Sequence, residues 1–92
     1  MTDEACTSYE DIIENFVIGH EFALKNFGVK PRIGWQLDPF GHSNTNIRIF
    51  AELGFDAFFM ARIDTDDKAR RMKNKELEWI HRPYSKSLGV ET

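Results

Sequence analysis

The most constraining feature of the chain is a stretch near its middle, at positions 34–43, which reads Gly-Trp-Gln-Leu-Asp-Pro-Phe-Gly-His-Ser. An apolar, strand-like run ends there in a carboxylate, Asp38, and Pro39 stops the strand because it has no N–H to donate. Gly41 permits a tight turn, and Ser43 can cap a following helix. The stretch therefore predicts a strand, a turn and a helix start, with Asp38 at the carboxyl end of the strand.

Asp38 has two interpretations at this stage. The chemistry of α/β barrels and doubly wound sheets lies at the carboxyl ends of strands, which makes Asp38 a candidate site residue. The alternative is that Asp38 only begins the turn, because Asp before Pro is a common turn starter. One Asp-Pro pair does not decide between them, and local chemistry alone favours the turn.

A strand, a helix and a second strand are predicted in succession around this stretch. The first strand covers about 31–37, the helix about 44–53 and the second strand about 55–63. The second strand is almost continuously apolar, which suits a strand buried on both faces of a parallel sheet. A strand–helix–strand succession of about this length is a right-handed βαβ unit, so the predicted fold class is α/β.

Helical patterns flank this unit, and one more strand is predicted near its end. Capping-box spacings and an apolar stripe of helical period predict a helix over about 8–27. A short helix is predicted over about 66–75 and a third strand over about 77–82, while 85–92 is expected to be loop.

Three parallel strands alone would leave two unpaired edges and one uncovered face. A chain of 92 residues is also one small domain at most. We therefore expect residues 1–92 to be a fragment of a single α/β domain, either a barrel or a doubly wound sheet.

Composition excludes several classes of partner. Acidic and basic residues are mixed and the net charge is −3, which gives no footprint for nucleic acid or for a membrane surface. No apolar run approaches the roughly 20 residues that span a bilayer, and the first residues lack the features of a signal peptide. Cys6 is the single cysteine, so an internal disulfide and a cysteine metal motif are both excluded.

The stretch at 34–43 closely resembles the W-x-[IL]-D-P-F-G-H-S segment of the retaining α-mannosidases of glycoside hydrolase family 38. The similarity extends over nearly the whole chain. Residues 1–5 resemble the family segment M-x-D-E-A, and residues 54–64 resemble its G-F-D-x-F-F-x-x-R-[LI]-D strand. Further matches fit the lysosomal and vacuolar branch better than the Golgi branch; they are Asp67-Lys68, Arg71-Met72 and Ser85–Gly89.

This resemblance implies a fragment of the family's N-terminal catalytic domain, which is α/β-barrel-like. The implied activity is that of a retaining, zinc-dependent α-mannosidase acting on terminal α-mannosyl residues of glycans. In the family, the Asp of D-P-F-G-H-S is both the nucleophile and a zinc ligand, and here that residue is Asp38. The family arginine is Arg62, expected beside the nucleophile and the substrate, where it would orient Asp38. Without the resemblance, Arg62 could equally be a surface residue at a strand end.

Most of the family's site falls outside this sequence. Of four expected zinc ligands the chain holds one, and the separate acid/base aspartate is absent. The chain's other candidate ligands show no zinc-site spacing; they are Cys6, His20, His42 and His81. The isolated chain is therefore expected to be inactive, and the rest of a parent polypeptide to supply the missing groups.

Five further polar residues fall in the family segments. His42 is expected to stabilise the turn or to hydrogen-bond behind the site, and Asp3 and Glu4 are given no role. Asp64 and Asp67 are expected to satisfy backbone groups at a helix start.

Two alternatives remain open on the sequence. The chain could belong to another metal-dependent carbohydrate hydrolase, such as a deacetylase, or it could be a truncated, non-catalytic chain or a small interaction module. The sequences that flank it would discriminate, because the mannosidase family carries an H-x-D zinc-ligand motif upstream. The resemblance implies a lysosomal, vacuolar or secretory location, which the residues themselves do not show.

Overall fold

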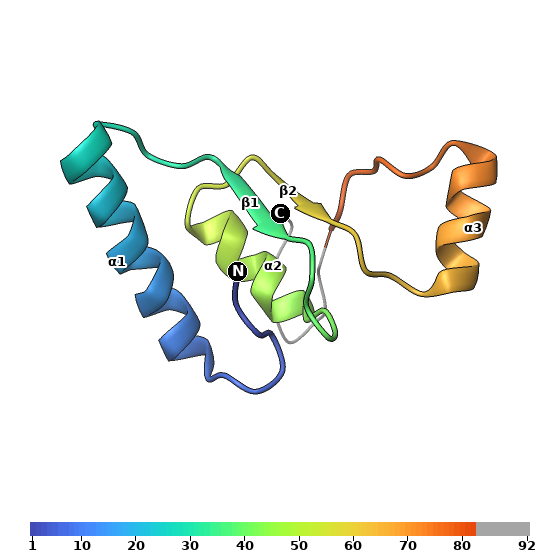
Figure 1. The fold of residues 1–92 in the computed structure, drawn as a ribbon, viewed down its shortest axis with the longest axis horizontal. Coiled ribbons are helices and arrows are strands. Elements are labelled where there is room, and N and C mark those ends of the chain that lie inside the picture. Colours follow the sequence, from blue (N-terminus) through green and yellow to red (C-terminus); the bar gives the residue numbers. More distant parts are fainter. Residues whose placement is uncertain (83–92) are drawn as a thin grey trace.

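The computed structural model describes residues 1–82, in which three helices and two strands alternate (Figure 1). Both strands are shorter than predicted, because the ladder between them spans four residue pairs. The elements, in chain order, are α1 (Tyr9–Phe27), β1 (Ile33–Gln36), α2 (Asn44–Glu52), β2 (Ala57–Met60) and α3 (Thr65–Asn74).

Helix α1 begins and ends at the residues that the capping patterns indicated. The hydroxyl of Ser8 accepts a hydrogen bond from the Asp11 backbone N–H at 3.2 Å, which satisfies one of the free donors of the first turn. Gly28 ends the helix with φ 66°, a left-handed conformation that costs glycine little.

Strands β1 and β2 pair in parallel, and α2 makes the crossover between them. Ile33 lies opposite Ala57 and Gln36 opposite Met60, so each residue of β1 faces the residue 24 positions further along the chain. A parallel pair joined by a helix is consistent with the predicted α/β class.

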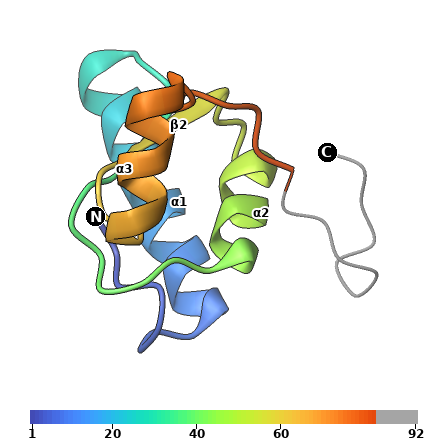
Figure 2. The ribbon, with the colours of Figure 1, turned by 90° about the vertical axis from the view of Figure 1, so that its right-hand side faces the viewer.

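The core lies between α1, α2 and one face of this sheet. Phe50 of α2 is 2% exposed, and its ring centroid lies 5.2 Å from that of Phe16 on α1 and 5.9 Å from that of Phe58 on β2. Helices α1 and α2 consequently lie side by side (Figures 1 and 2). Gly34 makes this packing possible, because a Cβ there would lie 3.2 Å from the Phe50 ring and 3.0 Å from the Phe58 Cβ.

The opposite face of the sheet is open in the part of the chain that the structure describes. Ile33, Trp35 and Phe59 are 49%, 57% and 56% exposed, and the Trp35 and Phe59 rings lie 5.8 Å apart. The sequence predicted that the second strand would be buried on both faces, whereas only the face toward α2 is covered. The apolar pattern of β2 suits a strand that is covered on both faces, and residues 1–82 cover one of them.

The strand predicted over 77–82 does not form, and the segment is irregular. Next to the end of α3, the Glu76 N–H donates to the Arg71 carbonyl at 2.8 Å, and the Arg71 guanidinium lies 4.2 Å from the Trp79 ring centroid. Apolar alternation favoured a strand, but among residues 1–82 the sheet contains only β1 and β2, and Trp79 packs against Arg71 instead of pairing with a strand edge. The loop expected over 85–92 lies outside the described residues.

Helix α3 lies at the opposite end of the molecule from α1 (Figure 1). Asp64 caps it by accepting a hydrogen bond from the Asp67 N–H at 3.0 Å. Among the described residues, no helix combines the length and the apolar character that crossing a membrane requires.

The Asp67 carboxylate gives α3 a predicted pH dependence. Hydrogen bonds from Arg71 and Arg70 lower the pKa of Asp67 below its ordinary value of 3.8. A depressed pKa in the folded state stabilises that state above pH 3.8, and the contribution is lost as the pH falls through the lower value. In a circular-dichroism titration of the full chain from neutral to acid pH, Asp67→Asn should reduce helix content at neutral pH and shrink the acid loss.

Asp66→Asn is the matched control, because Asp66 is an exposed neighbour in the same helical turn. Equal acid titrations for the Asp67→Asn variant and the unsubstituted chain would contradict the assignment.

Candidate active site

Asp38 and Arg62 lie beside each other beyond the carboxyl ends of the two strands. Each follows the last residue of its strand by two positions, and the register offset of 24 residues carries over from the ladder to this pair. The Arg62 Nε–H donates to Asp38 Oδ1 at 2.5 Å. The structure therefore brings together the two residues that the sequence predicted as site residues, while their roles remain predictions.

A second ion pair lies at the other end of the ladder, before the amino ends of the two strands. Arg32 precedes β1 and Asp56 precedes β2, again 24 residues apart, and their side chains approach to 2.5 Å. The two pairs run in opposite senses, with the arginine before β1 at one end and after β2 at the other. Parallel register thus explains both contacts.

The Asp38–Arg62 ion pair contributes little to the free energy of folding. The two side chains are 61% and 56% exposed, and exposed ion pairs contribute about 0–1 kcal/mol. Phe40 beside them is 88% exposed, with the Arg62 Cζ 5.3 Å from its ring centroid. A carboxylate, a guanidinium and an aromatic face are thus presented to solvent together, an arrangement suited to a ligand with hydroxyls and an apolar face.

A buried carboxylate lies behind this exposed group. The Glu4 side chain is 1% exposed and accepts hydrogen bonds through both oxygens. Its Oε1 accepts from the Ser43 N–H at 3.0 Å, and its Oε2 accepts from the Gln36 side-chain amide at 3.1 Å. The Nδ1 of His42 also lies 3.1 Å from Oε2.

Gln36 ties the N-terminal segment to β1. It is fully buried; its side-chain oxygen accepts from the Thr2 N–H at 3.0 Å and its amide donates to the Thr2 carbonyl at 2.9 Å. Gln36 was not among the site residues predicted from the sequence, although it shares the covered face of β1 with Gly34. A polar residue at a covered position was the signal that could have identified it. For Glu4, the sequence offered only its place in a family segment.

His42 connects Glu4 to the second strand's loop. Its Nε2 lies 2.7 Å from the Arg62 carbonyl oxygen, so the ring contacts the main chain of the residue whose side chain contacts Asp38. These contacts agree with the hydrogen-bonding role expected for His42. Asp3 serves a local turn instead: backbone N–H groups of Ala5 and Cys6 donate to its carboxylate and lower the pKa of Asp3.

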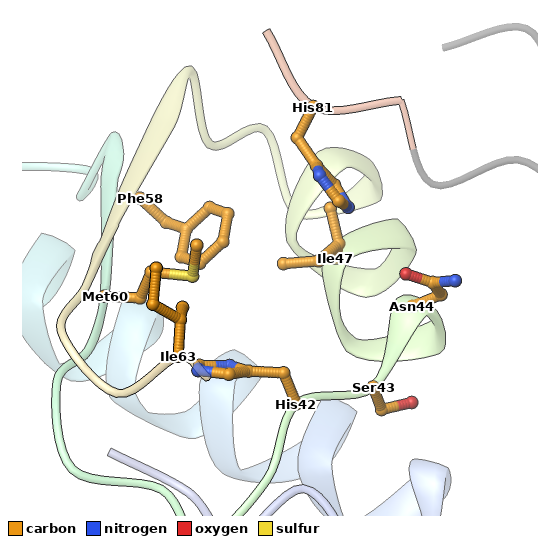
Figure 3. A pocket seen from close by; sticks show the side chains of 8 residues that line it. All are labelled: His42, Ser43, Asn44, Ile47, Phe58, Met60, Ile63 and His81. Atoms are coloured by element: carbon orange, nitrogen blue, oxygen red, sulfur yellow. The ribbon is translucent and has the colours of Figure 1, made fainter. Parts of the chain in front are cut away.

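A cavity of about 170 Å³ adjoins His42 (Figure 3), and Glu4 is not among its lining residues. Its wall is mainly apolar, and the His42 ring extends toward Met60 and Ile63 in this view. The lining residues are His42, Ser43, Asn44, Ile47, Phe58, Met60, Ile63 and His81. Asp38 and Arg62 do not line it, so the cavity adjoins His42 but not the Asp38–Arg62 ion pair.

The residues suited to a metal are dispersed. Over residues 1–82, no three histidine, cysteine or carboxylate side chains come close enough to hold an ion together. The Oδ2 of Asp38 makes no hydrogen bond to any of these residues, which leaves one carboxylate oxygen for a ligand. Both His42 nitrogens are engaged, so His42 is not available as a metal ligand.

Comparison with known proteins identifies relatives for almost the whole chain. The family model described as the glycosyl hydrolases family 38 N-terminal domain matches residues 1–88. The chain is 52% identical over 82 residues to a lysosomal alpha-mannosidase of Dictyostelium discoideum and 47% identical over 90 residues to an alpha-mannosidase of Canavalia ensiformis. It is 43% identical over 84 residues to the lysosomal alpha-mannosidase of Homo sapiens.

These alignments cover 89%, 97% and 89% of the chain in the order given, but 8%, 9% and 8% of the relatives. The chain therefore spans less than a tenth of the length of the curated relatives that it matches.

Proposed function

This chain belongs to glycosyl hydrolase family 38, within the family's N-terminal domain, and we propose that it is the nucleophile-bearing segment of an α-mannosidase. The proposed substrates are glycans with terminal α-mannosyl residues. The observation that carries the proposal is the contact of Arg62 Nε with Asp38 Oδ1 at the carboxyl end of a parallel strand pair. The lysosomal names of several relatives support a lysosomal or vacuolar location for the parent enzyme.

The remainder of a longer polypeptide completes the proposed domain. The open face of the sheet supports this, because Ile33, Trp35 and Phe59 leave an apolar and aromatic surface exposed. Parallel sheets occur almost only with both faces covered. A further layer and further strands around β1 and β2 would give the α/β-barrel-like catalytic domain that the family resemblance implies.

Asp38 is the proposed nucleophile of a retaining reaction. Retaining glycosidases use two carboxylates about 5–5.5 Å apart, one as nucleophile and one as acid/base. A carboxylate oxygen of Asp38 attacks the anomeric carbon while the glycosidic bond breaks, and the leaving oxygen takes its proton from an acid outside this chain. The conjugate base of that acid then takes a proton from water, whose oxygen attacks the anomeric carbon of the mannosyl ester as the bond to Asp38 breaks. Arg62 orients the carboxylate throughout, since its Nε–H holds Oδ1 and leaves Oδ2 open.

Asp38 also fits the proposed role of zinc ligand, because it is exposed and its Oδ1 keeps a second lone pair beside the Arg62 hydrogen bond, while Oδ2 stays open for the attack. Bound there, zinc would hold the carboxylate in place and polarise sugar hydroxyls. The other ligands are proposed to come from the rest of the parent polypeptide.

A second candidate is a chain without catalytic function by itself. It is favoured by the dispersed metal-binding side chains of residues 1–82. A deacetylase of another family has no comparable support, since the mannosidase family model matches residues 1–88.

The 92-residue chain alone is predicted neither to bind zinc with sub-micromolar affinity nor to hydrolyse an α-mannoside. One carboxylate does not make a four-coordinate site, and both carboxylates are needed for the reaction. Calorimetric titration with zinc and an assay with 4-nitrophenyl α-D-mannoside measure the two properties. Tight zinc binding together with turnover would contradict the prediction that the site is incomplete.

The proposed function itself is tested in a complete enzyme. In a chimera, hereafter the chimeric mannosidase, this chain replaces the matching segment of the Dictyostelium discoideum lysosomal alpha-mannosidase. Turnover of 4-nitrophenyl α-D-mannoside, lost on zinc chelation and restored by zinc, is expected. A fluorinated mannoside should label Asp38. A folded chimera labelled at another residue would contradict the assignment of the nucleophile.

A further inference from the structure

His42 lies between two oxygens, and both accept hydrogen bonds in this arrangement. Its Nε2 is 2.7 Å from the Arg62 carbonyl, which can only accept. Its Nδ1 is 3.1 Å from Oε2 of Glu4, a carboxylate that also accepts from the Ser43 N–H and the Gln36 amide. The two contacts together need a proton on Nε2, which donates to the carbonyl, and one proton between Nδ1 and Oε2.

The Asp38–Arg62 pair lies outside the hydrogen-bonded part of the sheet. Strand β1 ends at Gln36 and β2 ends at Met60, so no ladder bond holds either residue. The Asp38 N–H donates to the Met1 sulfur at 3.1 Å, and sulfur is a weak acceptor. The main-chain position of Arg62 therefore depends on contacts other than the sheet.

Glu4 reaches both loops that carry the pair. Through Oε1 it binds the Ser43 N–H, at the end of the loop that follows Asp38. Through Oε2 and the His42 ring it reaches the Arg62 carbonyl. One buried carboxyl group thus contacts the loop after Asp38 directly and the main chain of Arg62 through the His42 ring.

We propose that Glu4 and His42 are positioning residues, which fix the main chain of Arg62 and thereby hold its guanidinium on the Asp38 carboxylate. The inference rests on the proposed function, since it assigns a purpose to the geometry of that site. Neither residue touches the exposed edge where substrate is proposed to bind. Their effect is exerted through Arg62, and a displacement of about 1 Å at a reacting group can cost about 100-fold in rate.

The test is a double-mutant cycle in the chimeric mannosidase with His42→Gln, Arg62→Lys and both together. A glutamine amide cannot donate to both acceptors in the geometry of the ring. His42→Gln should lower kcat about 10-fold, equivalent to about 1.4 kcal/mol, and leave KM within about twofold. The double variant should fall at most about threefold below Arg62→Lys, because lysine has already lost the fork that His42 positions.

A purely structural role would give a different pattern. It would lower the amount of folded enzyme and leave kcat per folded molecule unchanged, or it would give losses that multiply in the cycle. Either result overturns the inference. Glu52→Gln is the control, because Glu52 forms an exposed ion pair with Arg48 on α2 and should leave kcat unchanged.

Glu4→Gln provides a second route in the same cycle if His42→Gln does not fold. It keeps the size of the side chain but replaces the carboxyl group that contacts both His42 and the Ser43 N–H, and the same coupling with Arg62→Lys is expected. If neither variant folds, Glu4 and His42 are folding determinants and the inference is overturned. Turnover and labelling of the unsubstituted chimera test the proposed function separately, so a multiplicative cycle in an active chimera overturns the inference alone.

Discussion

Asp38→Asn in the chimeric mannosidase is expected to lower kcat by about four to six orders of magnitude, the range seen when members of a catalytic unit that includes the nucleophile are removed. Asparagine keeps the shape of the side chain but removes the charge. The variant therefore loses the attacking oxygen and, in the proposed site, a strong metal ligand. Steady-state turnover of 4-nitrophenyl α-D-mannoside measures the loss, and the fluorinated mannoside should no longer label the peptide.

Asp56→Asn is the matched control for this substitution. Asp56 is also exposed and also pairs with an arginine across the ladder, but at the amino ends of the strands. Its replacement removes a comparable ion pair and should leave turnover within about twofold, since exposed pairs contribute about 0–1 kcal/mol. Substantial activity in a folded Asp38→Asn enzyme would remove Asp38 from the role of nucleophile.

Arg62→Lys is expected to lower kcat/KM about 30- to 150-fold, equivalent to about 2–3 kcal/mol. Lysine keeps the positive charge but has no Nε–H donor at the position that holds Asp38 Oδ1. It also loses the planar fork that could contact the carboxylate and a sugar oxygen together. Kinetics of the purified variant with the same mannoside provide the measurement.

Arg32→Lys controls for the general effect of exchanging arginine and lysine across this ladder. Arg32 pairs with Asp56 at the same 24-residue offset as Arg62 with Asp38, and its side chain is 76% exposed. It should show unchanged kinetics. If Arg62→Lys also kept normal kinetics, Arg62 would be a structural residue at a strand end.

The sequence predicted those elements whose signals are local. Helix α1 begins after Ser8 and ends before Gly28, as the capping chemistry of these residues indicated. The turn at 38–41 separates β1 from α2. The contact between Asp38 and Arg62 was expected from the family resemblance, while the 24-residue register that produces it became visible only in the structure.

Features that depend on distant partners were not predictable in the same way. The strand expected over 77–82 had suitable alternation, but a strand also needs an edge to pair with, and Trp79 packs against Arg71 instead. Glu4 received no role because its partners lie more than thirty residues away, at Gln36 and His42. Burial of a charge is a property of the assembled fold, and no spacing in the sequence encodes it.

The two ion pairs at the ends of the ladder also favour the observed register of β1 and β2 over shifted registers. A slip by two residues is the smallest that keeps the same side chains on each face. One such slip would place Asp38 opposite Asp64 and leave Arg32 without a carboxylate, and the opposite slip would pair Asp38 with a methionine. Only the observed alignment matches both charges. In a chain with a shifted register, Asp38 would not lie beside Arg62. The correct strand register and the proposed catalytic geometry therefore depend on the same contact.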